Sequence, residues 1–244
     1  MDSACAERWT IVVPYKGGLA AKSRLGHAAG GVAGLRPRMR HRLALAFLRD
    51  TVAAAAAVPG VADIIVVSSD PVLLTTIPDI ILLADPGQGL NIAATAGIDR
   101  ARSLNPRRPV AVLTGDLPCL DSRDLAAALS LAAKHPLSVV PDIHGSGSTM
   151  ICALPGTAVR PQFGLDSFLA HVRAGHTVLP IPAVSTLRRD VDSVEDLHQS
   201  LRRGVGKYTR SAVLQPWAWP RLERLDDPGG PQSPLGAAGR RARH

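Results

Sequence analysis

Three aspartates lie where their carboxylates could bind a divalent cation. Asp116 lies just beyond the apolar run 110–114, and Asp190 and Asp192 flank Val191. If residues 190–192 form a strand, Asp190 and Asp192 face the same side and repel each other unless a cation lies between them. Mg²⁺ prefers few carboxylates together with phosphate oxygens and water. The aspartates therefore predict a magnesium site, with helix capping by Asp116 and two exposed acids as the plainer alternatives.

A basic loop with glycines follows the first apolar run, 10–13. It begins at Pro14 and reads P-Y-K-G-G-L-A-A-K-S-R-L. Its cations are Lys16, Lys22 and Arg24. Gly17 lets the backbone approach a ligand, and positive charge beyond a strand end suits a triphosphate. Because the Walker A spacing is absent, a solvated basic loop explains this segment equally well.

Two further loops could enclose a nucleotide. The G-L-N motif places Leu90 and Asn91 at the start of a helical stretch, where an amide and free N–H groups could contact a purine or ribose. Ser68 follows the apolar run 64–67 and could lie against the base. Taken alone, Asn91 is also a plausible N-cap, and Ser68 also fits an ordinary turn.

Two segments rich in small residues could hold an anionic group. The segment H-G-S-G-S-T ends at Thr149 and offers backbone N–H groups and hydroxyls without bulk. The segment F-G-L-D-S-F contains Gly164 and Ser167 at the start of a helical stretch. Either could be an ordinary turn.

The sequence lacks the arrangement of a covalent hydrolase. There is no G-x-S-x-G motif, and none of the eight histidines has H-x-x-x-H spacing. Separated acids with cationic loops favour phosphoryl-type transfer, in which the protein positions the reactants and neutralises charge.

The segments that must position these loops alternate between short apolar runs and longer Ala- and Leu-rich stretches. Strands are expected at 10–13, 64–67, 80–84, 110–114, 138–140 and 149–153. Helices are expected at 36–57, 91–103, 122–134, 167–174 and 193–202, with Ser122 and Ser193 as N-caps. This alternation predicts an α/β fold with a mostly parallel, twisted sheet and helices on both faces. Ligands in such folds bind beyond the carboxyl ends of the strands.

Composition and charge limit the alternatives. With 244 residues, of which 46% are hydrophobic, the chain can bury one α/β core. The net charge of +8 is concentrated in residues 201–244, which carry nine Lys or Arg against three Asp or Glu. We therefore expect a nearly neutral catalytic domain at 9–210 and a disordered Pro/Gly/Arg-rich tail at 211–244. The charge does not favour nucleic acid as a partner, since only Trp217 and Trp219 could offer stacking there.

The sequence also favours a cytoplasmic location. No apolar run approaches the roughly 20 residues that span a bilayer, and residues 1–8 contain no apolar segment typical of a secretory signal. The three cysteines are widely spaced, which favours neither a disulfide framework nor a zinc site. We therefore expect no membrane partner, and a homodimer is left open.

The motifs occur in the order found in a known enzyme family. From about residue 9 to 205 they are V-V-P-Y-K with A-K-S-R-L, G-L-N, G-D-L-P, H-G-S-G-S-T, F-G-L-D-S-F and D-V-D. The sequence thereby resembles the 2-phospho-L-lactate/phosphoenolpyruvate guanylyltransferases of coenzyme F-420 biosynthesis. Each motif is common alone, but the ordered set is specific. Related nucleotidyltransferases usually begin with a G-G-x-S/G-x-R loop, which this sequence lacks.

The resemblance implies a single-domain, Rossmann-like nucleotidyltransferase that transfers GMP from GTP to a small phosphorylated three-carbon acid. It implies Mg²⁺ as cofactor, bound by Asp116, Asp190 and Asp192. Phosphates would contact Lys16, Lys22 and Arg24, which with Asp116 form the expected catalytic set. The nucleotide pocket is expected to include Pro14, Gly17, Ser68, Leu90 and Asn91. The acceptor carboxylate would be held near Thr149, Gly164 and Ser167.

Other readings stay open on the sequence alone. The acceptor could be phosphoenolpyruvate, 2-phospholactate or 3-phosphoglycerate, and the Ala- and Arg-rich composition, typical of a high-GC bacterium, favours phosphoenolpyruvate. A metal-dependent glycosyltransferase that uses a nucleotide sugar also needs a D-x-D motif, although there the motif usually follows a middle strand. A basic nucleic-acid-binding protein is the non-enzymatic alternative.

Overall fold

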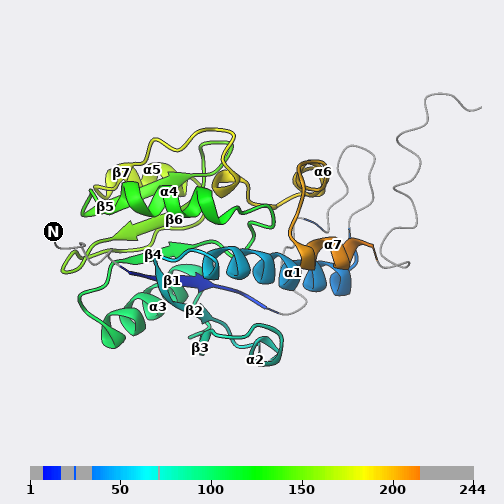
Figure 1. The fold of residues 1–244 in the computed structure, drawn as a ribbon, viewed down its shortest axis with the longest axis horizontal. Helices are drawn as coiled ribbons and strands as arrows, with labels where there is room; N and C mark the ends of the chain where they lie inside the picture. Colours follow the sequence, from blue (N-terminus) through cyan, green and yellow to red (C-terminus); the bar gives the residue numbers. More distant parts are fainter. Residues whose placement is uncertain (1–7, 18–24, 26–34, 71, 215–244) are drawn as a thin grey trace, which may run out of the picture.

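The computed structural model describes residues 8–17, 25, 35–70 and 72–214. In this part of the chain, seven strands form one sheet between two layers of helices (Figure 1). The strands are β1 (Trp9–Pro14), β2 (Val61–Val67), β3 (Ile81–Leu83), β4 (Val110–Leu113), β5 (Leu137–Pro141), β6 (Ser148–Ala153) and β7 (Thr177–Val178). The helices are α1 (Pro37–Ala56), α2 (Leu73–Thr76), α3 (Leu90–Leu104), α4 (Ser122–Ala132), α5 (Ser167–Arg173), the 3₁₀ helix η2 (Thr186–Arg188), α6 (Val194–Arg203) and α7 (Lys207–Val213).

The sheet is mostly parallel, which confirms the expected fold class. Its strand order is β3-β2-β1-β4-β6-β5-β7, and only β6 runs antiparallel to its neighbours. The chain builds outward from β1 to β3 and then returns to place β4 on the other side of β1. This reversal of strand order lies at β1 and β4, and open α/β sheets usually bind ligands beyond the carboxyl ends of the strands at such a position.

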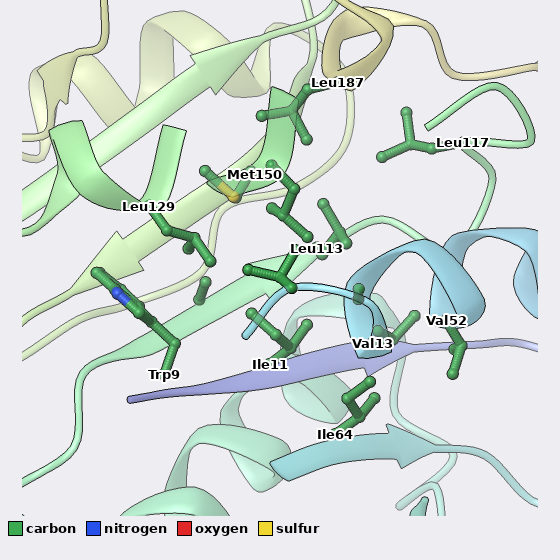
Figure 2. Packing of buried hydrophobic residues seen from close by; sticks show 14 of the residues in the cluster. Trp9, Ile11, Val13, Val52, Ile64, Leu113, Leu117, Leu129, Met150 and Leu187 are labelled. Atoms are coloured by element: carbon green, nitrogen blue, oxygen red, sulfur yellow. The ribbon is translucent and has the colours of Figure 1, made fainter. Parts of the chain in front are cut away.

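Alternating side chains on the strands serve two separate hydrophobic clusters, one on each face of the sheet. On β1, Ile11 and Val13 pack in the cluster beneath α1 and α4, whereas Val12 packs in the cluster beneath α3. Figure 2 shows Ile11 and Val13 close to Leu113 of β4 and Met150 of β6. This strict alternation is what holds helices on both faces.

Helix α3 packs very closely on the centre of the sheet. A Cβ atom added to Gly97 would lie 2.2 Å from Cγ1 of Val12 and 3.0 Å from Cγ2 of Val67. Glycine at this position therefore lets the α3 backbone approach β1 and β2, and this contact fixes the position of α3 on the sheet.

Most expected elements are present, and several details differ. Residues 190–192 do not form a strand, which corrects that expectation. The N-cap of α4 is Asp121, whose side chain accepts from the N–H of Arg123, and Ser122 is the first helical residue. The N-cap of α3 is Gly89, not Asn91. The capping box of Ser193 at α6 is confirmed. Elements α2, β7, η2 and α7 were not expected from the sequence.

Helix α7 packs beside α1 (Figure 1) and is capped by a side chain of α1. Asp50 is buried and accepts hydrogen bonds from the N–H groups of Tyr208 and Thr209, at 3.0 and 2.8 Å. The guanidinium of Arg49 stacks on the ring of Tyr208, 3.8 Å from its centroid. The domain boundary expected at residue 210 lies inside this helix.

The expected tail falls largely outside the described residues, since they end at Leu214. Among the described helices, none has both the length and the apolar character needed to cross a bilayer.

Candidate active site

Asp116 is held rigidly just after β4. The Thr114 N–H donates to the carbonyl of Thr149 at 2.9 Å, and the Leu117 N–H donates to the Thr51 hydroxyl at 3.1 Å. A Cβ on Gly115 would lie 3.1 Å from a methyl of Leu48, so the backbone here presses against α1. These contacts on both sides of Asp116 fix its main chain just beyond the carboxyl end of β4.

Asp190 and Asp192 reach the same place from an irregular segment between η2 and α6. The Val191 N–H donates to the carbonyl of Asp116 at 3.0 Å, and the Val191 side chain is buried between α1 and α6. Asp196 accepts from the N–H of Asp192 at 3.2 Å, which anchors the far end of the segment. The expected alternation of buried Val191 with two half-buried acids is therefore present, but hydrogen bonds and packing produce it instead of a strand.

The upstream end of this segment is fastened to α4. Asp124 accepts three hydrogen bonds, from the N–H and hydroxyl of Thr186 at 2.6 and 2.7 Å and from the hydroxyl of Ser185 at 2.9 Å. Burial alone would raise the pKa of Asp124, but these hydrogen bonds lower it below its ordinary value. The charged carboxylate thus fixes η2, and η2 leads directly into the acidic segment.

The three carboxylates converge. Asp116, Asp190 and Asp192 each offer an oxygen, and these oxygens lie within 4.8 Å of one another. Around Mg²⁺, at a metal–oxygen distance of about 2.1 Å, ligand oxygens lie no more than about 4.2 Å apart. Small side-chain rotations would therefore close the set around this ion, and the all-oxygen donors match its preference.

The loop after β1 begins near Gly115, the residue before Asp116, since a Cβ on Gly115 would lie 4.0 Å from the carbonyl of Pro14. This loop is described only in part. Pro14 is buried as the last residue of β1, and the N–H of Tyr15 donates to the carbonyl of Val67 at 2.9 Å. Lys16 is exposed to solvent. A Cβ on Gly17 would lie 2.9 Å from Cβ of Asp70, so this glycine permits a close approach to the loop after β2. The expected phosphate ligands Lys22 and Arg24 lie outside the described residues.

The expected nucleotide residues on β2 and α3 make different contacts. Ser68 is buried at the end of β2, and its hydroxyl accepts from the N–H of Asp70 at 3.2 Å, as a turn residue would. Leu90 is 44% exposed at the first position of α3. The side chain of Asn91 is hydrogen-bonded to the main chain of Phe163. Asn91 therefore lies between the expected nucleotide and acceptor sides.

The glycine-rich loop joins β5 to β6 and is shaped by Asp142. Its carboxylate accepts from the N–H groups of Ser146 and Gly147 at 3.1 and 2.7 Å. Arg188 donates twice to the Asp142 carbonyl, at 3.2 and 2.8 Å, and so ties the loop to η2. Because β6 is reversed, its first residues and Thr149 lie at the same edge as the carboxyl ends of the parallel strands. Thr149 is fully buried.

Gly164 and Ser167 lie close together at the start of α5. The N–H of Ser167 donates to the carbonyl of Gly164 at 3.2 Å, and Ser167 is buried. Gly164 has a φ of +132°, which only glycine adopts readily. The N–H of Phe168 donates to the carbonyl of Ser146 at 3.1 Å and links this turn to the glycine-rich loop. The two predicted anion-binding segments therefore form one wall of the site.

Sequence reasoning missed His171, which is fully buried behind that wall. Its Nε2 accepts from the N–H of Gln162 at 2.9 Å, and its Nδ1 lies 3.0 Å from the hydroxyl of Ser148. Since Nε2 accepts, the proton is on Nδ1. Burial and the neighbouring His176 lower the pKa of His171 to about 4, so the ring is neutral at pH 7. A single histidine in a helical stretch gives no sequence signal that it will be buried and hydrogen-bonded to Gln162 and Ser148.

Relatives with known names share most of the chain. A phosphoenolpyruvate guanylyltransferase from Streptomyces coelicolor is 42% identical over 211 residues, which cover 85% of this chain and 97% of that protein. The enzyme of the same name from Salinispora arenicola is 39% identical over 227 residues, covering 88% of this chain and 97% of its own.

Solved structures of the same fold are more distant. A 4-diphosphocytidyl-2C-methyl-D-erythritol synthase is 13% identical with a TM-score of 0.53, covering 81% of this chain and 98% of its own. A nucleotidyl transferase from Methanothermobacter is 14% identical with a TM-score of 0.51, covering 84% and 99%. These likenesses concern the fold alone. The family model described as "Guanylyl transferase CofC like" matches residues 9–215, and the chain belongs to this family.

Proposed function

We propose that this protein transfers GMP from GTP to phosphoenolpyruvate with release of pyrophosphate, using Mg²⁺, in coenzyme F-420 biosynthesis in the cytoplasm. The observation that carries the proposal is the convergence of Asp116, Asp190 and Asp192, whose carboxylate oxygens lie within 4.8 Å of one another. The choice of acceptor is supported by the names of relatives that are 38% to 42% identical.

In the proposed reaction, a phosphate oxygen of the acceptor attacks the α-phosphorus of GTP. A new P–O–P linkage forms as the bond to pyrophosphate breaks. No side-chain nucleophile is needed, because the acceptor phosphate is already anionic at pH 7. Mg²⁺ bound by the three aspartates would offset the repulsion between that phosphate and the triphosphate.

Other residues of the protein would bind the pyrophosphate, the acceptor and the nucleotide. Lys16, Lys22 and Arg24 neutralise the charge that develops on the leaving pyrophosphate. Thr149, Gly164 and Ser167 hold the acceptor carboxylate, which fixes the acceptor phosphate in line with the bond that breaks. The nucleotide lies along Pro14, Gly17, Ser68 and Leu90.

The proposal is tested by measuring pyrophosphate release from GTP with phosphoenolpyruvate, 2-phospholactate and 3-phosphoglycerate in turn, with and without Mg²⁺. We expect Mg²⁺-dependent release, fastest with phosphoenolpyruvate. Faster release with one of the other acids would change the acceptor and keep the transfer. Release with none of them, together with turnover of a nucleotide sugar, would favour a glycosyltransferase instead.

The stereochemical course tests the direct displacement. With GTP made chiral at the α-phosphorus by sulfur, one in-line attack gives inversion in the guanylylated product. A covalent enzyme–GMP intermediate requires two displacements and gives net retention. Phosphorus NMR of the product distinguishes the two, and retention would exclude the direct mechanism.

A further inference from the structure

The side-chain amide of Asn91 pairs with both main-chain groups of Phe163. The Phe163 N–H donates to Oδ1 of Asn91 at 2.7 Å, and Nδ2 of Asn91 donates to the Phe163 carbonyl at 3.0 Å. A neighbouring strand would hold a residue in the same two-bond manner. Here the side chain of Asn91 makes both hydrogen bonds to Phe163, a residue 72 positions away in the sequence.

This pairing limits what else the amide can do. If Asn91 turned toward a nucleotide, a donor and an acceptor of Phe163 would lose their partners in a partly buried place, which is costly. The Phe163 ring is itself buried against α3, in the cluster that contains Ala93 and Ala94. The geometry therefore gives Asn91 an anchoring task rather than the reading of a base.

The anchored residue is followed directly by the expected acceptor groups. Gly164 comes next, in the backbone conformation that favours glycine, and its carbonyl accepts from the N–H of Ser167. Any movement of Phe163 would therefore move Gly164 and the first turn of α5.

A second side chain, that of His171, holds the preceding residue. Nε2 of His171 accepts from the N–H of Gln162 at 2.9 Å, and its ring meets the Phe163 ring edge-on with centroids 5.2 Å apart. Asn91 comes from α3 and His171 from α5, so the loop at 162–164 is fixed by one polar side chain from each helix.

We infer that Asn91 is a positioning residue for the acceptor: it holds Phe163 so that Gly164 and Ser167 stand ready to bind the acceptor's carboxylate. The inference rests on the proposed function, because it takes that wall of the site as the acceptor side. It predicts that loss of the Asn91 amide weakens acceptor binding and leaves GTP binding nearly unchanged.

The experiment compares wild type, Asn91→Ala and Asn91→Asp with the control Ser103→Ala, an exposed position on the same helix. For each protein, calorimetry gives the Kd of GTP with Mg²⁺ and no acceptor, and steady-state kinetics give kcat and KM for phosphoenolpyruvate. Hydrogen exchange at the Phe163 N–H reports the anchor directly. Asn91→Asp keeps the oxygen that accepts from this N–H, whereas Asn91→Ala removes it.

We expect Asn91→Ala to raise the KM for phosphoenolpyruvate about tenfold or more, while the Kd of GTP changes less than about twofold. Exchange of the Phe163 N–H should quicken most in Asn91→Ala, less in Asn91→Asp, which keeps the acceptor but loses the donor to the Phe163 carbonyl, and should stay slow in Ser103→Ala. A rise in the Kd of GTP equal to the rise in KM would overturn the inference and return Asn91 to the nucleotide pocket. Faster exchange with an unchanged KM would also overturn it. The wild-type assay separately tests the proposed function.

Discussion

The three aspartates of the candidate metal site lie close enough for their charges to interact before any substrate binds. The oxygens of Asp116, Asp190 and Asp192 lie within 4.8 Å of one another, at which distance like charges repel appreciably. The hydrogen bonds and packing around Val191 keep them together nevertheless. A cation bound by all three carboxylates, as proposed, should therefore stabilise the folded protein.

The aspartates can be tested one at a time. Asp116→Asn, Asp190→Asn or Asp192→Asn should each lower kcat/KM by about 100-fold or more, because each removes a proposed metal ligand. Wild type should gain melting temperature when Mg²⁺ is added, and the variants should gain little. Asp99→Asn, on the exposed side of α3, is the control. Near-normal turnover in any one variant would remove that residue from the metal site.

His171 predicts a measurable dependence of stability on pH. Burial and His176 lower its pKa to about 4 in the folded protein, whereas an unfolded histidine titrates near 6.5. Between these values the unfolded state binds more protons, so stability falls as pH falls. The contribution of this residue at pH 5 is a loss of about 2 kcal/mol relative to pH 7.5.

The check is urea unfolding from pH 7.5 to 5. His171→Gln cannot take up this proton, so its free energy of unfolding should fall less than that of wild type between pH 7.5 and 5. At pH 7.5 this free energy should already be lower than that of wild type. His144→Gln, at an exposed position of the glycine-rich loop, should follow wild type. Parallel slopes for wild type and His171→Gln would contradict the assignment.

Helix α3 lies against the sheet because residue 97 has no side chain. In Gly97→Ala, the added Cβ would lie 2.2 Å from Cγ1 of Val12. Overpacking of this kind costs about 1–3 kcal/mol, which exceeds the gain of up to about 1 kcal/mol in helix propensity. We expect a net loss of unfolding free energy in urea titrations. Gly60→Ala is the matched control, since a Cβ there meets nothing within 4 Å. Removing the clash with Val12→Ala should recover part of the loss in the double variant, and no recovery would point to another cause.

The sequence predicts the regular elements of this fold well and the irregular ones poorly. Long periodic stretches such as α1 and α3 match the structure within a residue or two at each end. The segment at 190–192 could not be predicted, because its shape depends on a hydrogen bond to Asp116 and on the burial of Val191, both of which are long-range. Helix α7 was missed for a similar reason, since Asp50 caps it from α1.

In the candidate site, too, features that depend on local sequence could be predicted, and features that depend on long-range contacts could not. The three aspartates were picked out from the sequence because Asp116 follows an apolar run and Asp190 and Asp192 have i, i+2 spacing, and the structure brings their carboxylates together. The pairing of Asn91 with Phe163 could not be predicted, because the two residues are 72 positions apart in the sequence. The expected N-cap at Ser122 failed by one position, because Asp121 caps the helix better with a charged acceptor.

The described chain ends with a helix that belongs to the body of the protein. A chain that ends at Leu214 keeps all of α7 and should retain the wild-type kcat and melting temperature. A chain that ends at Gly206 loses α7, leaving the buried Asp50 without the two N–H groups that it accepts from Tyr208 and Thr209. We expect that loss to cost about 2–4 kcal/mol of stability.

Thermal unfolding and turnover of both truncated chains decide this point. Ending the chain at Arg210 keeps the capped first turn of α7, so catalysis should persist with a smaller loss of stability. A large drop for the chain that ends at Leu214 would show that residues 215–244 support the domain.

The hydrogen bond from Val191 to Asp116 has a consequence for protein synthesis. Asp116 leaves the ribosome well before Asp190 and Asp192, so a growing chain can form β1 and β4 while it still lacks two of the three acids. Prematurely terminated products that stop before residue 190 lack two of the three proposed metal ligands, and we expect them not to consume GTP even where the sheet has formed.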